Sequence, residues 1–228
     1  MQDEISEAVL ANEDVVRYLR GGYGDSGAQA REKINGYLDE LRTTQRHKFY
    51  RALQHPLYPI LRKIERKHEN LHYVTNAVGK HRIVYSSNHK SHCDYLVEPL
   101  VLDDNGIRPP LIAAGINLFG GPLGLINKHV TGAIPIRRNT KDPAYLSTLK
   151  AYVAEIVKKH DIFFYPEGGR SYSGELKSAK TGIFNAVLDS DRSDLVKVDI
   201  EVKDTTPWVR KDDEKLLQQS WTWTVDIN

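Results

Sequence analysis

Residues 83–95 read Ile83-Val84-Tyr85-Ser86-Ser87-Asn88-His89-Lys90-Ser91-His92-Cys93-Asp94-Tyr95. The apolar start of this segment is typical of a short buried strand, and the pattern that begins at Tyr95 is typical of a helix. Between them lies a polar loop that contains His89 and Asp94. A strand that runs through such a loop into a helix is the repeating unit of α/β proteins, so the segment predicts that fold class.

The same alternation continues along the chain. Further apolar runs of strand type occupy residues 111–114, 133–136 and 162–165, and helical patterns occupy residues 95–102, 118–126, 145–159 and 181–188. Near the end, apolar residues alternate with polar ones over 196–202 and again over 221–227, as on half-exposed strands. We therefore predict an α/β fold with a mixed, largely parallel sheet flanked by helices.

A helical segment is expected before this domain. Apolar residues recur at helical spacing over 5–19, 34–41 and 53–64, with a glycine-rich loop after the first of these patterns. The predicted organisation is an N-terminal helical region, residues 1–75, followed by an α/β domain, residues 76–228.

Composition limits the possible functions. The formal net charge is +2, from 32 basic and 30 acidic residues, which gives no electrostatic support for a nucleic-acid partner. A single cysteine excludes an internal disulfide framework and fits a reducing compartment. The first ten residues lack the apolar core of a secretory signal, and no uninterrupted apolar run reaches the ~18 residues of a spanning helix.

His89 and Asp94 form a candidate catalytic pair. A carboxylate that orients an imidazole lets it remove a proton from an alcohol near neutral pH. Five positions on a regular helix correspond to a rotation of ~140°, so the pair can meet only if His89 lies in the loop and Asp94 in the first helical turn. Two alternatives stay open: a structural histidine, or a metal site with His92 and Cys93, although the lone cysteine supplies no second ligand pair.

Two later segments place cations at the ends of predicted strands. Residues 132–138 end in Arg137 and Arg138, whose planar guanidinium groups suit phosphate recognition. In that segment Pro135 indicates an edge strand or a bulge. Residues 163–171 run from an apolar strand into a glycine pair that allows close backbone approach to a ligand. The candidate site residues of this second segment and the helix start after it are Glu167, Gly168, Arg170, Ser171 and Lys180.

These segments together resemble the conserved blocks of the glycerolipid acyltransferases. Residues 89–95 resemble the first block, His-Arg-Ser-His-x-Asp-Tyr, of the glycerol-3-phosphate acyltransferases, and residues 113–118 resemble the same subgroup. Residues 132–138 are similar to the second block, with Pro135 in the place of an aromatic residue. Residues 163–171 resemble the third block, and the Lys-Thr-Gly that starts at Lys180 is also found in the subgroup.

The resemblance implies a glycerol-3-phosphate acyltransferase-like fold and an acyl transfer that needs no metal or redox cofactor. The donor would be acyl-CoA or acyl carrier protein, the acceptor glycerol 3-phosphate, and the product lysophosphatidic acid. His89 would act as general base and Asp94 would orient it. Phosphate would be held by Arg138 and Arg170, with Arg137 and Lys180 as further contacts, and Glu167 would orient one of these cations.

The family's fourth block, an apolar strand leading into a proline, has no clear counterpart. Residues 196–202 lie where it is expected, and Pro207 is displaced. Two alternatives therefore stay open: acylation of lysophosphatidic acid or dihydroxyacetone phosphate, and a non-catalytic relative that binds acyl chains or lipids.

We also expect a cytoplasmic protein that attaches peripherally to the cytoplasmic face of the membrane. Apolar residues near 118–126 would enter the bilayer interface, with basic residues Arg62, Lys63, Arg66 and Lys67 beside anionic lipid.

Overall fold

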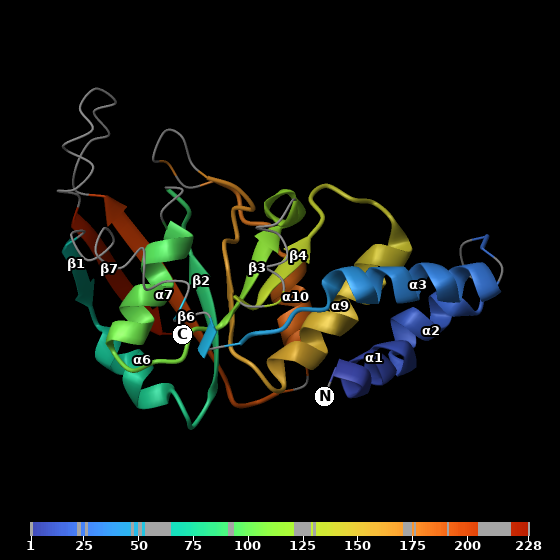
Figure 1. Ribbon diagram of the computed structural model, residues 1–228, viewed down its shortest axis with the longest axis horizontal. Helices are drawn as coiled ribbons and strands as arrows, with labels where there is room; N and C mark the ends of the chain where they lie inside the picture. Colours follow the sequence, from blue (N-terminus) through green and yellow to red (C-terminus); the bar gives the residue numbers. More distant parts are fainter. Residues whose placement is uncertain are drawn as a thin grey trace. The chain divides into compact units, whose positions relative to one another are not determined.

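The chain divides into two compact units, each made of three separate stretches. In the computed structural model, the described residues are 2–21, 24–25, 27–46, 48–49, 52, 65–90, 94–120, 129, 131–170, 175, 177–190, 192–204 and 220–227. The first unit comprises Met1–Gln45, Ile112–His160 and Lys180–Ser193, and the second comprises Arg46–Leu111, Asp161–Ala179 and Asp194–Asn228. Figure 1 labels the elements of both units.

A five-stranded sheet forms the centre of the second unit. Its strands are β1 (Glu65–Glu69), β2 (Arg82–Ser87), β5 (Ile162–Phe164), β6 (Leu195–Asp204) and β7 (Ser220–Ile227), in the order β1-β7-β6-β2-β5. All neighbouring pairs are parallel except β6 and β7, which are antiparallel. The prediction of an α/β fold with a mixed, largely parallel sheet is confirmed.

Burial explains the interior position of β2 in this sheet and the apolar sequence of β5 beside it. Ile83, Tyr85 and Ile162 are inaccessible to solvent, and the ring of Tyr85 stacks on that of Phe163 with 6.0 Å between centroids. Buried parallel strands of this kind are near-continuously apolar, which is the pattern visible in the sequence. The same unit contains helices α6 (Leu71–Ala77) and α7 (Asp94–Asp104) among its described residues.

The first unit is built around helix α9 (Pro143–Val157), which carries nine buried residues. It contacts α1 (Gln2–Ala11), α2 (Glu13–Leu19), α3 (Gly27–Leu41) and α10 (Gly182–Leu188). The same unit contains β4 (Ala133–Ile136), which pairs in parallel with β3 (Leu111–Gly115), and the 3₁₀ helix η1 (Ile116–Phe119). Strand β4 lies at the edge of its sheet, as Pro135 predicted.

The first helical pattern was predicted as one helix over residues 5–19, and this was wrong. Asn12 interrupts it because its side chain accepts a hydrogen bond from the Asp14 amide, at 3.0 Å, and so caps a new helix. After this cap the buried face of the helix shifts by one residue. Val15 and Tyr18 are buried, whereas the expected pattern had Val16 and Leu19 on the buried face.

The helical region was also expected to reach residue 75, but residues 65–69 form strand β1, which pairs with β7. Cross-strand pairing overrides the helix-compatible composition of this short segment. The third helical pattern, residues 53–64, and the larger part of the pattern at 118–126 lie outside the described residues. The domain boundary at residue 75 stays a prediction.

Candidate active site

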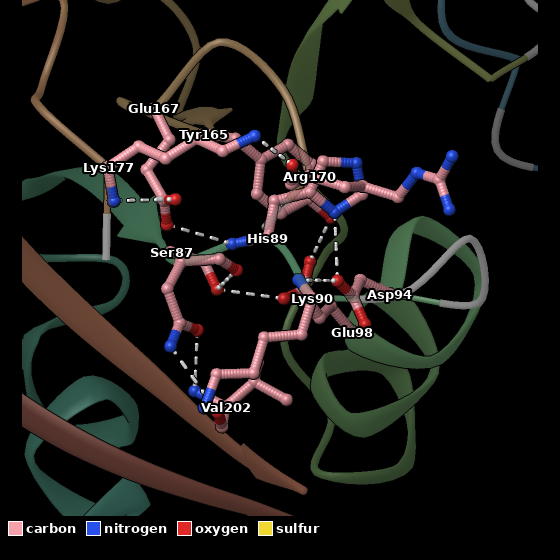
Figure 2. Close-up of polar contacts among 11 residues, drawn as sticks. Ser87, His89, Lys90, Asp94, Glu98, Tyr165, Glu167, Arg170, Lys177 and Val202 are labelled. Carbon is pink, nitrogen blue, oxygen red and sulfur yellow. Dashed lines mark hydrogen bonds and ion pairs between the residues drawn. The ribbon is translucent and has the colours of Figure 1, made fainter. Parts of the chain in front are cut away.

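The loop after β2 brings His89 and Asp94 together. The Nδ1 atom of His89 lies 2.8 Å from Oδ2 of Asp94, and the backbone amide of Lys90 donates to the same oxygen at 2.8 Å (Figure 2). Asp94 is the first residue of α7 and is inaccessible to solvent, whereas the His89 side chain is 16% exposed. The geometry predicted for this pair, a loop histidine and a carboxylate in the first helical turn, is present.

The carboxylate of Glu167 supports this loop from the other side. Its Oε1 atom accepts from the backbone amide of His89 at 3.3 Å, and Oε2 accepts from the backbone amide of Lys177 at 3.1 Å. Glu167 was expected to orient one of the cations proposed for phosphate binding, whereas the hydrogen bonds of its two oxygens are to main-chain amides. The segment 163–171, through Glu167, therefore helps to fix the backbone that carries His89.

A second pair of side chains lies behind the imidazole. The ring of Tyr165 stacks on that of His89, with 4.1 Å between centroids and 19° between planes. The hydroxyl of Tyr165 donates to Oε2 of Glu98 at 2.5 Å, and Oε1 of Glu98 lies 2.8 Å from the Ser87 hydroxyl oxygen. Burial raises the pKa of Glu98 well above its ordinary value, and the nearby charge of Asp94 raises it further.

Asn88 joins the same loop to strand β6. Its side-chain oxygen accepts from the Val202 amide at 2.8 Å, and its side-chain nitrogen donates to the Val202 carbonyl at 3.3 Å. The amide thus pairs with β6 as another strand would. Residues 196–202, which occupy the expected place of the fourth block, are therefore held directly against the residue before His89.

In the first unit, the two predicted arginines have different surroundings. Arg137 donates from Nε and Nη2 to the two carboxylate oxygens of Glu40, at 2.8 and 2.5 Å. Its guanidinium lies 4.9 Å from the ring centroid of Tyr37 and 5.4 Å from that of Tyr145. A guanidinium engaged in this way holds α3 next to β4 and has little capacity left for phosphate.

Arg138 is exposed and lies across Gly115 at the end of β3. A methyl group at Gly115 would lie 2.7 Å from Nη2 of Arg138 and 2.6 Å from Oδ1 of Asn117, which is closer than real carbon contacts. The glycine therefore leaves space for the guanidinium. This gives a physical reason for the glycine within residues 113–118, the run that resembles the acyltransferase subgroup.

The other candidate residues are distributed between the two units. Lys180 lies before α10 in the first unit and its amine donates to the Asn139 side chain at 3.4 Å. Gly168 and Arg170 belong to the second unit. Gly168 has a φ of 65°, in the left-handed region that favours glycine. Ser171 lies outside the described residues.

Within the described ranges, no group of three or more histidine, cysteine, aspartate or glutamate side chains could hold a metal ion. His92 and Cys93, the remaining members of the predicted metal alternative, fall outside those ranges. A search of the described helices for an apolar length sufficient to cross a bilayer finds none.

Several residues of this site were missed at the sequence level, although the sequence contains a signal for some of them. Glu98 is an acid inside the otherwise apolar helical run 95–102, four residues after Asp94 and so on the same helix face. Tyr165 ends a predicted strand, where side chains of α/β sites gather. The contacts of Asn88 and Ser87 depend on tertiary structure and have no comparable local signal.

Comparison with known proteins assigns the class. The Acyltransferase family matches residues 64–200, which is more than half of the chain and includes the His89–Asp94 pair and the third segment. The chain belongs to the acyltransferase family.

Within this class, the chain is similar to proteins named glycerol-3-phosphate acyltransferase. It is 34% identical to that of Glaesserella parasuis serovar 5 over 175 residues, which cover 74% of this chain and 21% of the relative. It is 36% identical to that of Pseudoalteromonas translucida over 172 residues, covering 72% and 21%. The resemblance seen in the sequence is confirmed. The chain spans about a fifth of the length of these curated relatives.

Among solved structures, the 1-acyl-sn-glycerophosphate (LPA) acyltransferase PlsC from Thermotoga maritima matches with a TM-score of 0.42 and 14% identity. The match covers 100% of this chain and 84% of that one.

Proposed function

We propose that this protein transfers a fatty acyl group from a thioester donor, acyl-CoA or acyl carrier protein, to the primary hydroxyl of glycerol 3-phosphate. The product would be lysophosphatidic acid. The observation that carries the proposal is the 2.8 Å contact between His89 and a solvent-inaccessible Asp94 in the loop after β2. Membership of the acyltransferase family and the names of the relatives support the same reaction.

In this mechanism the Nδ1–H group of His89 donates a hydrogen bond to Asp94, which leaves the unprotonated Nε2 as the base. Nε2 takes the proton of the acceptor hydroxyl while the oxygen attacks the thioester carbonyl. A carbon–oxygen bond forms, the carbon–sulfur bond breaks, and the imidazolium returns the proton to the departing thiolate. General acid–base catalysis of this kind contributes about 10²–10⁴-fold in rate.

Phosphate binding is proposed for Arg138 and Arg170, with Lys180 as a further contact. Arg138 is the stronger candidate of the pair at the end of β4, because Arg137 is engaged by Glu40 and two tyrosine rings. Binding of the phosphate would hold the reacting hydroxyl in place beside His89, which lowers the entropic cost of reaching the transition state. Gly168 and Ser171 are proposed to supply groups near the same phosphate.

The catalytic proposal is tested by His89→Ala and Asp94→Asn, assayed for lysophosphatidic acid with acyl-CoA and with acyl carrier protein donors. Both substitutions should lower kcat by at least about 10²-fold. Wild-type rates in both variants would contradict the mechanism. Acceptor profiling with dihydroxyacetone phosphate and lysophosphatidic acid identifies the acceptor, and tight acyl-CoA binding without turnover would favour the non-catalytic alternative.

Peripheral attachment to a membrane surface is proposed through apolar residues at η1, where Ile116 and Leu118 are exposed. Of the basic residues first considered, Arg66 pairs with Asp104 at 2.8 Å, and Arg62 and Lys63 lie outside the described residues. Leu118→Asp should reduce flotation with anionic phosphatidylglycerol vesicles. Unchanged flotation of that variant would argue against attachment at η1.

A further inference from the structure

We propose that Tyr165 and Glu98 are positioning residues for His89: Glu98, as a neutral carboxylic acid, fixes the Tyr165 hydroxyl, and the Tyr165 ring fixes the plane of the imidazole. This inference rests on the acyl-transfer function proposed above, and it adds a role for two residues that the catalytic pair does not include. All the side chains concerned belong to the second unit and are drawn in Figure 2.

The first step is the stacking of the two rings. The contact with Asp94 fixes one atom of the imidazole, but rotation about that hydrogen bond would still move Nε2. Tyr165 lies nearly parallel to the imidazole at 4.1 Å and blocks this rotation from one side. The second ring therefore determines the direction in which Nε2 faces the acceptor hydroxyl.

The second step is the anchoring of Tyr165. Its ring packs edge-on against Phe163 at 5.3 Å, and its hydroxyl reaches Glu98 at 2.5 Å. Glu98 is 1% exposed and lies in α7, one turn after Asp94. The same helix thus carries both the carboxylate that bonds His89 and the carboxyl that holds the ring stacked on it.

The third step is the protonation state of Glu98, which follows from the neighbouring hydroxyl. The Ser87 oxygen lies 2.8 Å from Oε1 of Glu98 and 3.1 Å from the carbonyl oxygen of Asn88. A hydroxyl has one proton and a carbonyl oxygen only accepts, so Ser87 alone can satisfy only one of these two contacts. A proton on Oε1 of Glu98 satisfies both at once, because Glu98 then donates to Ser87 and Ser87 donates to the Asn88 carbonyl.

Charge gives an independent reason for the same state. Asp94 and Glu167 already place two carboxylates around His89, and a third ionised carboxyl without a facing cation would be costly in a buried position. Among the described residues Glu98 contacts the hydroxyls of Ser87 and Tyr165 and no lysine or arginine, and the Lys177 amine donates to the Arg170 carbonyl. A neutral Glu98 bonds Tyr165 without adding charge beside the base.

Four variants test the positioning role. Tyr165→Leu removes the ring and should lower kcat by about 10²-fold, with a much smaller change in KM for the acceptor. Tyr165→Phe keeps the ring and should lose less than about 10-fold, the effect of one hydrogen bond. Glu98→Gln reproduces the neutral acid, so it should retain activity within about threefold and rescue the loss seen in Glu98→Leu.

Tyr85→Phe is the matched control. Tyr85 is a buried tyrosine of the same sheet, and its hydroxyl has no hydrogen-bond partner among the described residues. Removing that hydroxyl should leave kcat and the pH profile unchanged. Urea unfolding of each variant verifies that it is folded.

The second readout is independent of turnover. Nitrogen-15 spectra of the His89 ring, assigned by comparison with His89→Gln, report which nitrogen carries the proton. Wild type and Glu98→Gln should both show protonated Nδ1, and Tyr165→Leu should show averaged tautomers. If wild type has no turnover with any donor, the proposed function fails, and these spectra still decide the positioning role.

Two results would overturn the proposal. One is a Tyr165→Leu variant with wild-type kcat and an unchanged His89 spectrum, since the ring would then have no influence on the imidazole. The other is a Glu98→Gln variant as impaired as Glu98→Leu, because a charged carboxylate would then be required where the structure calls for a neutral acid.

Discussion

At the scale of single residues, the carboxyl of Glu98 couples protonation to stability. Burial and the charge of Asp94 raise its pKa in the folded protein above the value in the unfolded chain, ~4.3 for an ordinary glutamate. The folded state then binds more protons than the unfolded state above that pH. The contribution of Glu98 to the free energy of unfolding is therefore complete only below its pKa in the unfolded chain. This contribution is lost as pH rises through the raised pKa of Glu98 in the folded protein.

The prediction concerns Glu98→Gln, which cannot titrate. Between pH 5 and 8 the free energy of unfolding of wild type should fall relative to that of the variant, and the variant should be the more stable protein at pH 8. Urea unfolding across this range measures both curves. Glu155→Gln, which removes a partly exposed carboxylate paired with Lys158, is the control and should not change the slope. Parallel curves for wild type and Glu98→Gln would mean that Glu98 is ionised in the folded protein.

Gly115 permits a second prediction at this scale. Its missing side chain leaves space for the Arg138 guanidinium, so Gly115→Ala should displace that group and raise KM for glycerol 3-phosphate by about 10-fold, with less effect on kcat. The control is Gly120→Ala, because a methyl group there meets no atom within 4 Å. An equal effect of both substitutions would point to a disturbed loop rather than a displaced guanidinium.

At the scale of elements, strand β6 and the loop that carries His89 are joined by the Asn88 side chain. Asn88→Ala leaves the buried amide and carbonyl of Val202 without these partners, which should cost about 1–3 kcal/mol of unfolding free energy. Because the next residue is His89, kcat should fall as well. Guanidinium unfolding and steady-state kinetics on the same preparation measure the two effects.

The control for this variant is Asn105→Ala. Asn105 also bonds a backbone carbonyl, that of Val101 at 2.8 Å, but it follows the last residue of α7 and its bond reaches that helix rather than β6. It should lose some stability with no change in kcat. If Asn88→Ala lowers stability but leaves kcat unchanged, the contact with β6 stabilises the fold without ordering the loop that carries His89.

The elements themselves were largely predictable, and the reasons are physical. Continuous apolar runs at 83–85, 111–114, 133–136 and 162–165 correspond to β2, β3, β4 and β5, because buried strands need apolar side chains on both faces. The break at Asn12 was missed because a cap within a periodic pattern shifts it by only one residue. Strand β1 was missed because Glu65–Glu69 has no apolar residue, and only its pairing with β7 makes it a strand.

Some contacts of the site could likewise be predicted from residues close in sequence, and others depend on the tertiary fold. His89 and Asp94 are five residues apart, so their contact follows from one loop and one helix start. The role of Glu167 was predicted less well, because the amides that it bonds come from two distant segments, those of His89 and Lys177. Arg137 and Arg138 are adjacent in sequence, and tertiary contacts distinguish them, because Arg137 meets Glu40 and Tyr37 of α3.

At the scale of the whole molecule, Arg137 connects the N-terminal helix α3 to strand β4 within the first unit. Arg137 links β4 to α3 through Glu40 and lies over Tyr37 and Tyr145, whose rings meet edge-on at 5.3 Å. The backbone amide of Arg137 also donates to the Tyr145 hydroxyl at 2.8 Å. The contacts of Arg137 with Glu40 and Tyr37 connect residues about 100 positions apart, so they stabilise the first unit.

Substitution of the two arginines should therefore have opposite consequences. Arg137→Ala should lower the free energy of unfolding by about 1–2 kcal/mol, since it removes a bidentate ion pair and a cation–π contact, with KM for glycerol 3-phosphate little changed. Arg138→Ala should raise that KM strongly and leave stability within about 0.5 kcal/mol of wild type, as is usual for an exposed side chain. Urea unfolding and acceptor titrations separate the two effects, and a Glu40→Gln, Arg137→Ala double-mutant cycle measures the coupling of the ion pair. A large increase in KM for Arg137→Ala at unchanged stability would return Arg137 to the phosphate site and require Glu40 to release it when substrate binds.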